Sequence, residues 1–289
     1  MRLSLPSLAA AVGSTAAALA AATPAQGADA VFGGTATGGA PIVIRTDAKT
    51  QVLKSIAISW DASCANGRYF GAGDELTPVE PVDGFSPGPA ELLASRNAKG
   101  HFAGSQLAAR DLGDAVAAIA VQLSGKFNAK RSTGTLSATV KIMDKATSTE
   151  ITSCDSRKLS WVAARAPGTV YGGVTSQGEP MVLRLDSARR SVSDVITTWD
   201  ASCGDAGFLR SPDHFVRFPI KSTGRFGNAF TADDAMDAGA KRHVDYDIKG
   251  RVSTTAAKGT LQVKVTDTDA TGVATTCDSA GVTWKAATG

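Results

Sequence analysis

Cysteine and histidine are scarce in this sequence: its 289 residues include four cysteines and three histidines. The cysteines are isolated instead of forming CxxC pairs, and His101, His214 and His243 show no spacing typical of a zinc site. A metal site is therefore the weaker interpretation of the cysteines. A Ser/His/Asp triad would need one of the three histidines, and none lies in a recognisable local pattern.

Other familiar signatures are missing too. The chain contains no H-E-x-x-H zinc motif, no P-loop and no G-x-G-x-x-G dinucleotide fingerprint. After residue 30 no window approaches the apolar run of about 20 residues that a membrane-spanning helix needs. No basic block indicates a nucleic-acid partner. We predict no catalytic residue, no cofactor, no metal, no nucleic-acid partner and no membrane span in the mature chain.

Residues 1–30 are typical of a secretory signal peptide. A single arginine precedes an Ala/Leu-rich stretch, and small residues follow Pro24. We predict cleavage after Gly27 or Ala30, and a secreted, extracellular protein. The alternative is an N-terminal membrane anchor, which is weakened by the glycine and proline that interrupt the apolar run.

The most informative feature is an internal repeat. The pentapeptide WDASC occurs at residues 60–64 and again at 199–203. Residues 31–64 and 170–203 align at a constant offset of 139, with 13 of 34 positions identical. The identical pairs include Gly33/Gly172, Gly34/Gly173, Gly39/Gly178, Pro41/Pro180, Arg45/Arg184 and Asp47/Asp186. Chance is a poor explanation for such a match, so we predict two duplicated modules.

A second matched segment follows in each module. GTLSATVKIMD at 134–144 corresponds to GTLQVKVTDTD at 259–269, and the remaining two cysteines lie in SCDS and TCDS. Four cysteines allow three disulfide pairings. The repeat selects Cys64 with Cys154 and Cys203 with Cys277, one disulfide in each module, as an exported protein permits.

Alternation of apolar and polar residues predicts β-strands in both modules. Leu136 and Val140 fall on one side of their segment, with polar residues between them. The same parity places Trp60 on an inward face. Gly125 and Gly250 interrupt two predicted strands at positions where a bulge or kink would form.

We therefore predict an all-β protein with two tandem antiparallel β-sandwich domains, immunoglobulin-like in outline, each with one disulfide. The domains span residues 31–165 and 168–287, with a very short linker between them. A barrel is the alternative architecture.

Each module opens with an aromatic residue, two glycines, a polar turn and a proline, and closes with GTL, CDS and tryptophan. This pattern resembles the secreted β-modules that are repeated in many bacterial proteins, especially actinobacterial ones. Such modules generally carry no assigned activity. The resemblance covers most of the mature chain and rests on structural residue types. It implies export and repetition, and it transfers no catalytic residue.

Charged residues that recur on the outward side of the predicted strands are the candidate binding residues. They are Arg45, Asp47 and Asp61 in the first module and Arg184, Asp186 and Asp200 in the second. Two equivalent sites for an array of sugar hydroxyls are one interpretation. Cross-strand ion pairs that hold the strand register are the alternative.

One segment near the C-terminus resembles a calcium loop. Asp267, Asp269, Thr271, Gly272 and Asp278 fall at positions 1, 3, 5, 6 and 12 of an EF-hand-type pattern. The segment follows a predicted strand instead of a helix, so a hairpin turn is the simpler interpretation.

The Pro-rich segment 74–91 is the main insertion of the first module. It carries the acidic residues Asp74, Glu75, Glu80, Asp83 and Glu91. Loops that differ between related modules often carry function, but a surface insertion also costs little closure entropy.

Together these features predict a secreted, non-enzymatic protein that acts by binding or by structural presence outside the cell. An extracellular glycan or another cell-envelope component is the candidate partner. A secreted hydrolase that uses acidic residues of segment 74–91 is the first alternative. A calcium-stabilised adhesion module is the second.

Overall fold

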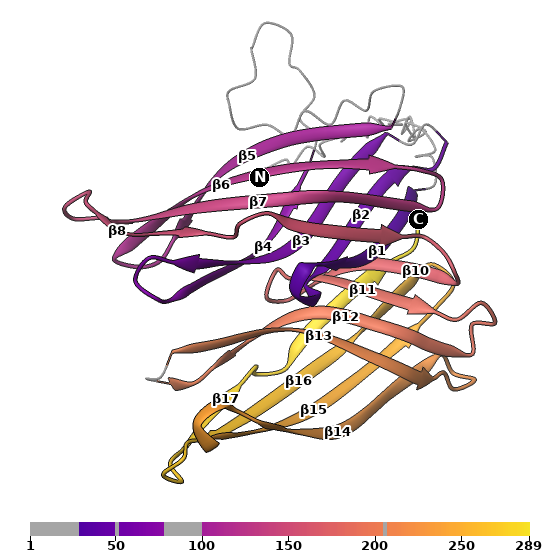
Figure 1. Cartoon of the computed structure of the whole chain (residues 1–289). Helices are drawn as coiled ribbons and strands as arrows, with labels where there is room; N and C mark the ends of the chain where they lie inside the picture. Colours follow the sequence, from indigo (N-terminus) through magenta and orange to yellow (C-terminus); the bar gives the residue numbers. More distant parts are fainter. Residues whose placement is uncertain (1–28, 50–51, 78–99, 205–206) are drawn as a thin grey trace, which may run out of the picture.

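The computed structural model describes residues 29–49, 52–77, 100–204 and 207–289, and its long elements are all β-strands (Figure 1). The expected signal peptide lies outside these ranges, except for Asp29 and Ala30, which begin the first strand. None of the described residues belongs to a helix long and apolar enough to cross a membrane.

The first half of the described chain contains nine strands and a 3-10 turn. These are β1 (Asp29–Ala36), η1 (Thr37–Gly39), β2 (Pro41–Asp47), β3 (Leu53–Cys64), β4 (Tyr69–Leu76), β5 (His101–Asp111), β6 (Ala115–Phe127), β7 (Arg131–Asp144), β8 (Glu150–Asp155) and β9 (Leu159–Ala164). The second half follows the same strand order. It contains β10 (Thr169–Thr175), β11 (Pro180–Leu185), β12 (Ser191–Ser202), β13 (Phe208–Pro219), β14 (Arg225–Ala235), η3 (Asp237–Gly239), β15 (Lys241–Val252), β16 (Ala256–Thr268), β17 (Ala274–Asp278) and β18 (Val282–Ala287).

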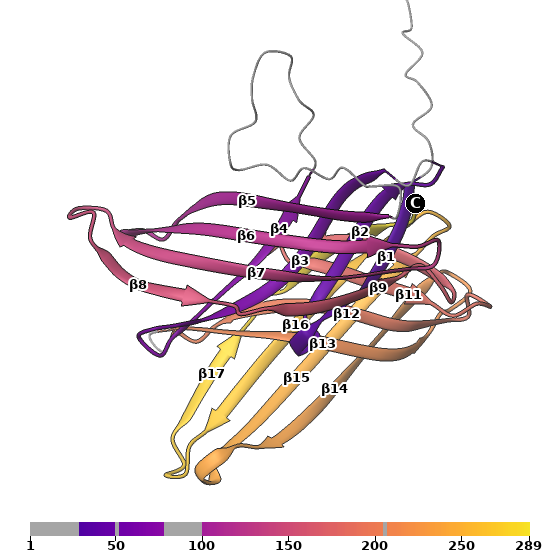
Figure 2. The same ribbon diagram turned by 45° about the horizontal axis from the view of Figure 1, so that its top comes forward.

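Each half forms one antiparallel sheet that curls on itself (Figure 1, Figure 2). The first sheet runs β4-β3-β2-β1-β9-β7-β6-β5, and the second runs β13-β12-β11-β10-β18-β16-β15-β14. In the first half β8 pairs with both β7 and β3, which closes β3, β2, β1, β9, β7 and β8 into a six-stranded barrel. In the second half β17 links β16 to β12, through the single pair Ser202 and Asp278 on the β12 side.

The all-β antiparallel prediction is confirmed, but the expected immunoglobulin-like sandwich does not form. A sandwich needs two separate sheets packed face to face, whereas all strands of a half belong to one continuous sheet. The physical cause in the first half is β8, which turns back from β7 and pairs with β3. The barrel alternative therefore describes the first half.

Both predicted disulfides are confirmed, one in each half. Cys64 bonds to Cys154, and Cys203 bonds to Cys277. Cys64 and Cys154 are also direct ladder partners between β3 and β8, so the disulfide fixes the strand that closes the barrel. Two disulfides indicate an oxidising environment, because reducing compartments keep thiols free.

The cores follow the predicted alternation. Leu136 and Val140 are buried on the inner side of β7, and each half has its own apolar cluster. The four tryptophans are among the largest fully buried side chains; they are Trp60, Trp161, Trp199 and Trp284.

The predicted bulge at Gly125 and Gly250 is absent. Strands β6 and β15 continue through these glycines without a register shift. A Cβ atom at Gly125 would lie 2.7 Å from the Trp161 ring, and one at Gly250 would lie 2.7 Å from the Trp284 ring. The rings of Phe102 and Phe226 come closer still, at 2.4 Å and 2.5 Å, so glycine is needed where a phenyl ring and an indole pack against the backbone.

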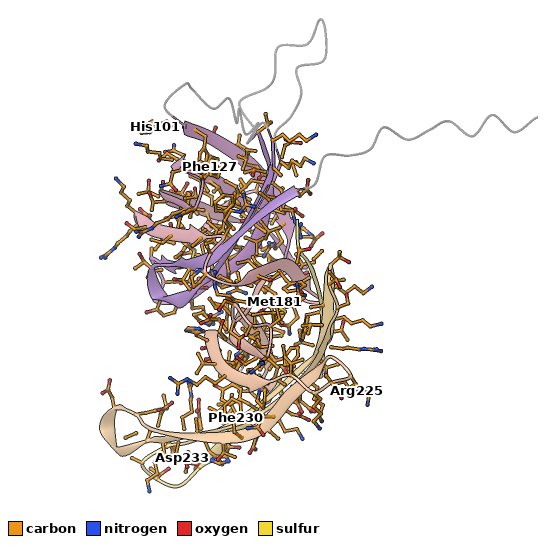
Figure 3. All side chains as sticks on the ribbon, turned by 90° about the vertical axis from the view of Figure 1, so that its right-hand side faces the viewer. His101, Phe127, Met181, Arg225, Phe230 and Asp233 are labelled. Atoms are coloured by element: carbon orange, nitrogen blue, oxygen red, sulfur yellow. A yellow bond between two sulfur atoms is a disulfide. The ribbon has the colours of Figure 1, made fainter. Side chains whose placement is uncertain are left out.

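The two halves lie against each other and bury an apolar layer of their own (Figure 3). Its members are Val31, Val43, Ala57, Val170, Val182 and Ile196. Gly33 faces Val182, and Gly172 faces Val43: added Cβ atoms would lie 2.4 Å and 2.3 Å from the Cγ1 atoms of these valines. The glycines therefore permit the close approach of β1 to β11 and of β10 to β2.

Candidate functional site

Arg45 and Arg184, two of the predicted binding residues, lie where the halves meet. Arg45 donates a hydrogen bond from Nη2 to the carbonyl oxygen of Gly172 at 2.6 Å, and Arg184 donates from Nη2 to that of Gly33 at 3.2 Å. Arg184 Nε also lies 3.7 Å from Asp194 Oδ2. Burial lowers the pKa of Arg184 below its usual value, and the charge of Asp194 opposes this shift. Each arginine thus donates a hydrogen bond to a glycine carbonyl of the other half, and together they hold the halves in contact.

Asp61 and Asp200 meet at Arg210 of β13. Arg210 Nε lies 3.0 Å from Asp61 Oδ1, and its Nη1 lies 3.1 Å from Asp200 Oδ1. The same guanidinium binds both oxygens of Glu179 at 2.8 Å and donates to Ser59 Oγ at 2.7 Å. Burial disfavours the charged form of Arg210, but the bonds to Glu179 and the neighbouring carboxylates outweigh burial and raise its pKa. Both predicted aspartates therefore take part in an ion network between the halves.

In the described part of the first half this network has no copy. Gly71 occupies the register position in β4 that Arg210 occupies in β13, and Ala40 aligns with Glu179. A Cβ atom at Gly71 would lie 2.4 Å from Arg210 Cδ. The small residues of the first half make room for the arginine of the second.

Asp47 and Asp186 stabilise the turns that follow their strands. Asp186 accepts hydrogen bonds from the Ser191 hydroxyl and the Arg190 amide, and Asp47 accepts one from the Lys49 amide. The bond from Ser191 is the main cause that lowers the pKa of Asp186. The six predicted residues are thus divided between the interface and two turns.

The calcium-like segment forms the hairpin between β16 and β17. Asp267 makes a bidentate pair with Arg242, both distances being 2.7 Å, and Asp269 accepts the amides of Thr271 and Val273 at 2.9 Å each. Across the described ranges, no three His, Cys, Asp or Glu side chains gather as a metal site would need. These carboxylates serve strand pairing and the turn.

The described part of segment 74–91 offers no pair of free carboxylates. Asp74 and Glu75 belong to β4, while Glu80, Asp83 and Glu91 lie outside the described residues. Asp74 accepts the indole N–H of Trp60 at 2.7 Å, as Asp213 accepts that of Trp199 at 2.5 Å in the second half. The occurrence of this pair in both halves indicates a structural role for Asp74.

Two arrangements resemble hydrolase machinery. Residues 84–88 read G-x-S-x-G, the pattern of the hydrolase elbow, and they lie outside the described residues. Asp194 lies 2.7 Å from His214 Nε2 and accepts the Ser193 hydroxyl at 2.8 Å. A catalytic triad needs the serine hydroxyl bonded to the imidazole and the imidazole bonded to the carboxylate. Here the Ser193 hydroxyl bonds directly to the Asp194 carboxylate, so these residues do not form a triad.

The outer face of the second sheet carries a row of four cations that sequence reasoning missed. Arg225, Arg251, Lys258 and Lys285 are successive register partners across β14, β15, β16 and β18. Figure 3 shows Arg225 on the outer side of this sheet. Within the described chain none of the four has an ion-pair partner. Like charges directly opposite one another destabilise a sheet, so this row is unfavourable without an anion. We call it the cationic row.

The first half lacks such a row. Its corresponding positions hold His101, Lys126, Thr133 and Val162. Only Lys126 among these is a permanent cation. The positive charge is therefore particular to the second half, and its sequence signal is a basic residue at the same outward position of four adjacent strands.

Two surface grooves adjoin the cationic row. One, of about 990 Å³, lies over the outer face of the second sheet and is also lined by Lys221 and Lys249. The other, of about 1020 Å³, lies between the halves and is also lined by Arg45 and Glu75. Three members of the row line both grooves; they are Arg251, Lys258 and Lys285. The row thus connects the two grooves.

Comparison with protein-family models, curated proteins and solved structures finds no match to this chain. The resemblance to secreted actinobacterial β-modules therefore stays a prediction. Because fold alone does not imply function, the function has to be argued from the chemistry of the site.

Proposed function

We propose that the protein is an exported, non-catalytic binding protein that holds an anionic extracellular ligand on its cationic row. The observation that carries this proposal is the alignment of Arg225, Arg251, Lys258 and Lys285 on one outer face without a described acidic partner. An anion placed over the row would turn repulsion between neighbouring strands into attraction.

The electrostatic setting supports a dedicated surface. The whole chain carries a formal net charge of only +3, so the row is a local excess and not a general property of the surface. Asp247 is the single acidic residue among the described ones that line the outer groove, and it pairs with Lys249 at 2.5 Å. The four cations of the row keep their charge available.

Export supports an extracellular ligand. Residues 1–30 read as a signal peptide, and one disulfide in each half suits an oxidising compartment. Duplication of a single ancestral module accounts for the shared strand order, and divergence of the two copies accounts for the cations that only one of them carries. Acidic polysaccharides and other envelope polyanions are the ligands that this chemistry fits.

Binding of purified polymers to the intact protein tests the proposal. We expect polygalacturonate or dextran sulfate to bind, with affinity that falls as salt rises, while neutral dextran does not bind. Charge reversal by Arg251→Glu should weaken binding at least tenfold. Lys126→Glu, at the corresponding position of the first half, is the matched control and should change binding less than twofold. Equal binding of neutral dextran, or an unaffected Arg251→Glu variant, would overturn the proposal.

A further inference from the structure

We infer that the ligand is a linear acidic polysaccharide, which crosses the strands of the second half along the cationic row and enters the groove between the halves at Arg45. This inference rests on the proposed function and names the ligand class of the same site. On this inference the first half contacts the ligand directly, through Arg45.

The length of the row favours a polymer over a small anion. Neighbouring strands lie about 4.8 Å apart, so four successive strands spread the charges over about 14 Å. A phosphate or a single sugar acid would contact one or two of these cations. A chain with an acidic group on each unit would contact all four, and the shared lining of the two grooves by Arg251, Lys258 and Lys285 gives it a continuous path.

A difference between the halves extends this path to Arg45. In the second half Arg184 pairs across the strands with Asp194. In the first half the corresponding partner of Arg45 is Ser55, which carries no charge. The carboxylate that accompanies Arg184 is therefore missing beside Arg45, and both Arg45 and Ser55 line the groove between the halves.

The groove between the halves combines charge with hydroxyl groups. Among the described residues its charged lining consists of Arg45, Arg251, Lys258 and Lys285 against one acidic residue, Glu75, a formal excess of three positive charges. Hydroxyl side chains also line it; they are Ser55, Ser222, Thr223, Ser253 and Thr254. Cations for acidic groups and hydroxyls for ring substituents suit an acidic sugar chain.

The same lining disfavours single-stranded nucleic acid. Proteins that hold unpaired bases present exposed aromatic rings on which the bases stack. The aromatic residues that border the outer groove are Phe226 and Trp284, and both are buried. The groove between the halves is lined by no aromatic residue among those described.

Calorimetry with galacturonate oligomers and the intact protein tests the inference. From monomer through dimer and tetramer to octamer, we expect affinity to rise at least a hundredfold and then to level off once the path is filled. Ser55→Asp places beside Arg45 the carboxylate that Arg184 already has. It should weaken octamer binding about fivefold to tenfold and leave dimer binding unchanged. Lys126→Ala is the matched control, and it should alter neither.

Each outcome separates the inference from the proposed function. If monomer and octamer bind equally well, the polymer is excluded while an anion site remains. If Ser55→Asp and Arg45→Gln both leave octamer binding unchanged, the path through the groove is wrong. If a single-stranded DNA of similar length binds more tightly than the octamer, the ligand class is wrong. If no anionic probe binds, the proposed function itself fails.

Discussion

Glu179 and Arg210 form a bidentate ion pair at the junction of the two halves, with both oxygens of Glu179 at 2.8 Å from guanidinium nitrogens. The Glu179 side chain is 4% exposed, so its carboxylate depends on this arginine for compensation. Arg210 also bonds to Asp61 and Ser59 of the first half. The pair therefore anchors one particular arrangement of the halves, on which the groove between them depends.

Removal of Arg210 should be costly. Arg210→Ala leaves the charge of Glu179 buried without a cation, and we expect the free energy of unfolding to fall by about 3–5 kcal/mol. Urea unfolding measures the change. Arg131→Ala, which removes an exposed arginine of β7, is the control and should cost less than about 0.5 kcal/mol.

A double variant tests whether this loss of stability comes from the Glu179 carboxylate that is left buried without a cation. Arg210→Gly with Glu179→Ala reproduces the Gly71 and Ala40 of the first half and removes both buried charges. It should recover more than half of the stability lost in Arg210→Ala, because removing both partners of a buried pair costs far less than removing one. A double variant as unstable as the single one would contradict this account.

Substitution of the glycines at the interface should destabilise the protein. In Gly172→Val the new Cβ would lie 2.3 Å from Val43 Cγ1, and overpacking of this kind costs about 1–3 kcal/mol. We expect a lower melting temperature and faster proteolysis near residues 165–168, with both disulfides intact. Adding Val43→Ala should restore part of the stability because it removes the clashing methyl groups. A Gly172→Val variant as stable as the parent would show that the halves do not meet closely.

The disulfide between β3 and β8 should contribute strongly to stability. Cys64 and Cys154 are 90 residues apart, and chain-entropy arguments give about 4–5 kcal/mol for a loop of this length. In Cys64→Ala with Cys154→Ala we expect this loss, together with faster hydrogen exchange in β8. The variant that lacks Cys203 and Cys277 should lose a similar amount, with the faster exchange in β17. Fast exchange spread over both halves in either variant would contradict this local role.

The strands and the disulfide pairing are predictable from the sequence because they depend on local pattern and on matched positions of the repeat. The alternation around Leu136 and Val140 gave the strands, and the matched cysteines gave the pairing of Cys64 with Cys154. Local sequence pattern does not predict the closure of the barrel, because closure depends on β8 pairing with β3 as well as with its neighbour β7. A strand's own residues do not specify its second partner.

The candidate site was harder to predict for the same reason. Arg45 stands out in the sequence because it recurs as Arg184, but the partner that explains it is the backbone carbonyl of Gly172 in the other half. The cationic row depends on the register of four strands, which places Arg225 and Lys285 in one line although 60 positions separate them in the sequence. Charge runs along the chain do not reveal such a row.

A buried carboxyl group should give the second half a distinct dependence on pH. Burial raises the pKa of Asp213 above its usual value, and the hydrogen bonds with Trp199 and Tyr246 oppose the rise. Since the folded pKa exceeds the unfolded value, protonation of Asp213 stabilises the folded state. This contribution is complete below the unfolded pKa of about 3.9 and is lost as the pH rises through the folded pKa.

Urea unfolding between about pH 3 and pH 7 should reveal this contribution. Asp213→Asn keeps an oxygen that accepts from Trp199 but cannot ionise, so it should match or exceed the parent in stability at neutral pH. The control is Asp269→Asn, because turn hydrogen bonds, the Thr271 hydroxyl first, lower the pKa of Asp269. A lowered pKa stabilises the fold above the unfolded value, so Asp269→Asn should lose stability at neutral pH and little at low pH. Equal or higher stability of Asp213→Asn at neutral pH, beside a loss in Asp269→Asn, would support burial as the cause. A loss at neutral pH in both variants would mean that Asp213 is favoured in its charged form.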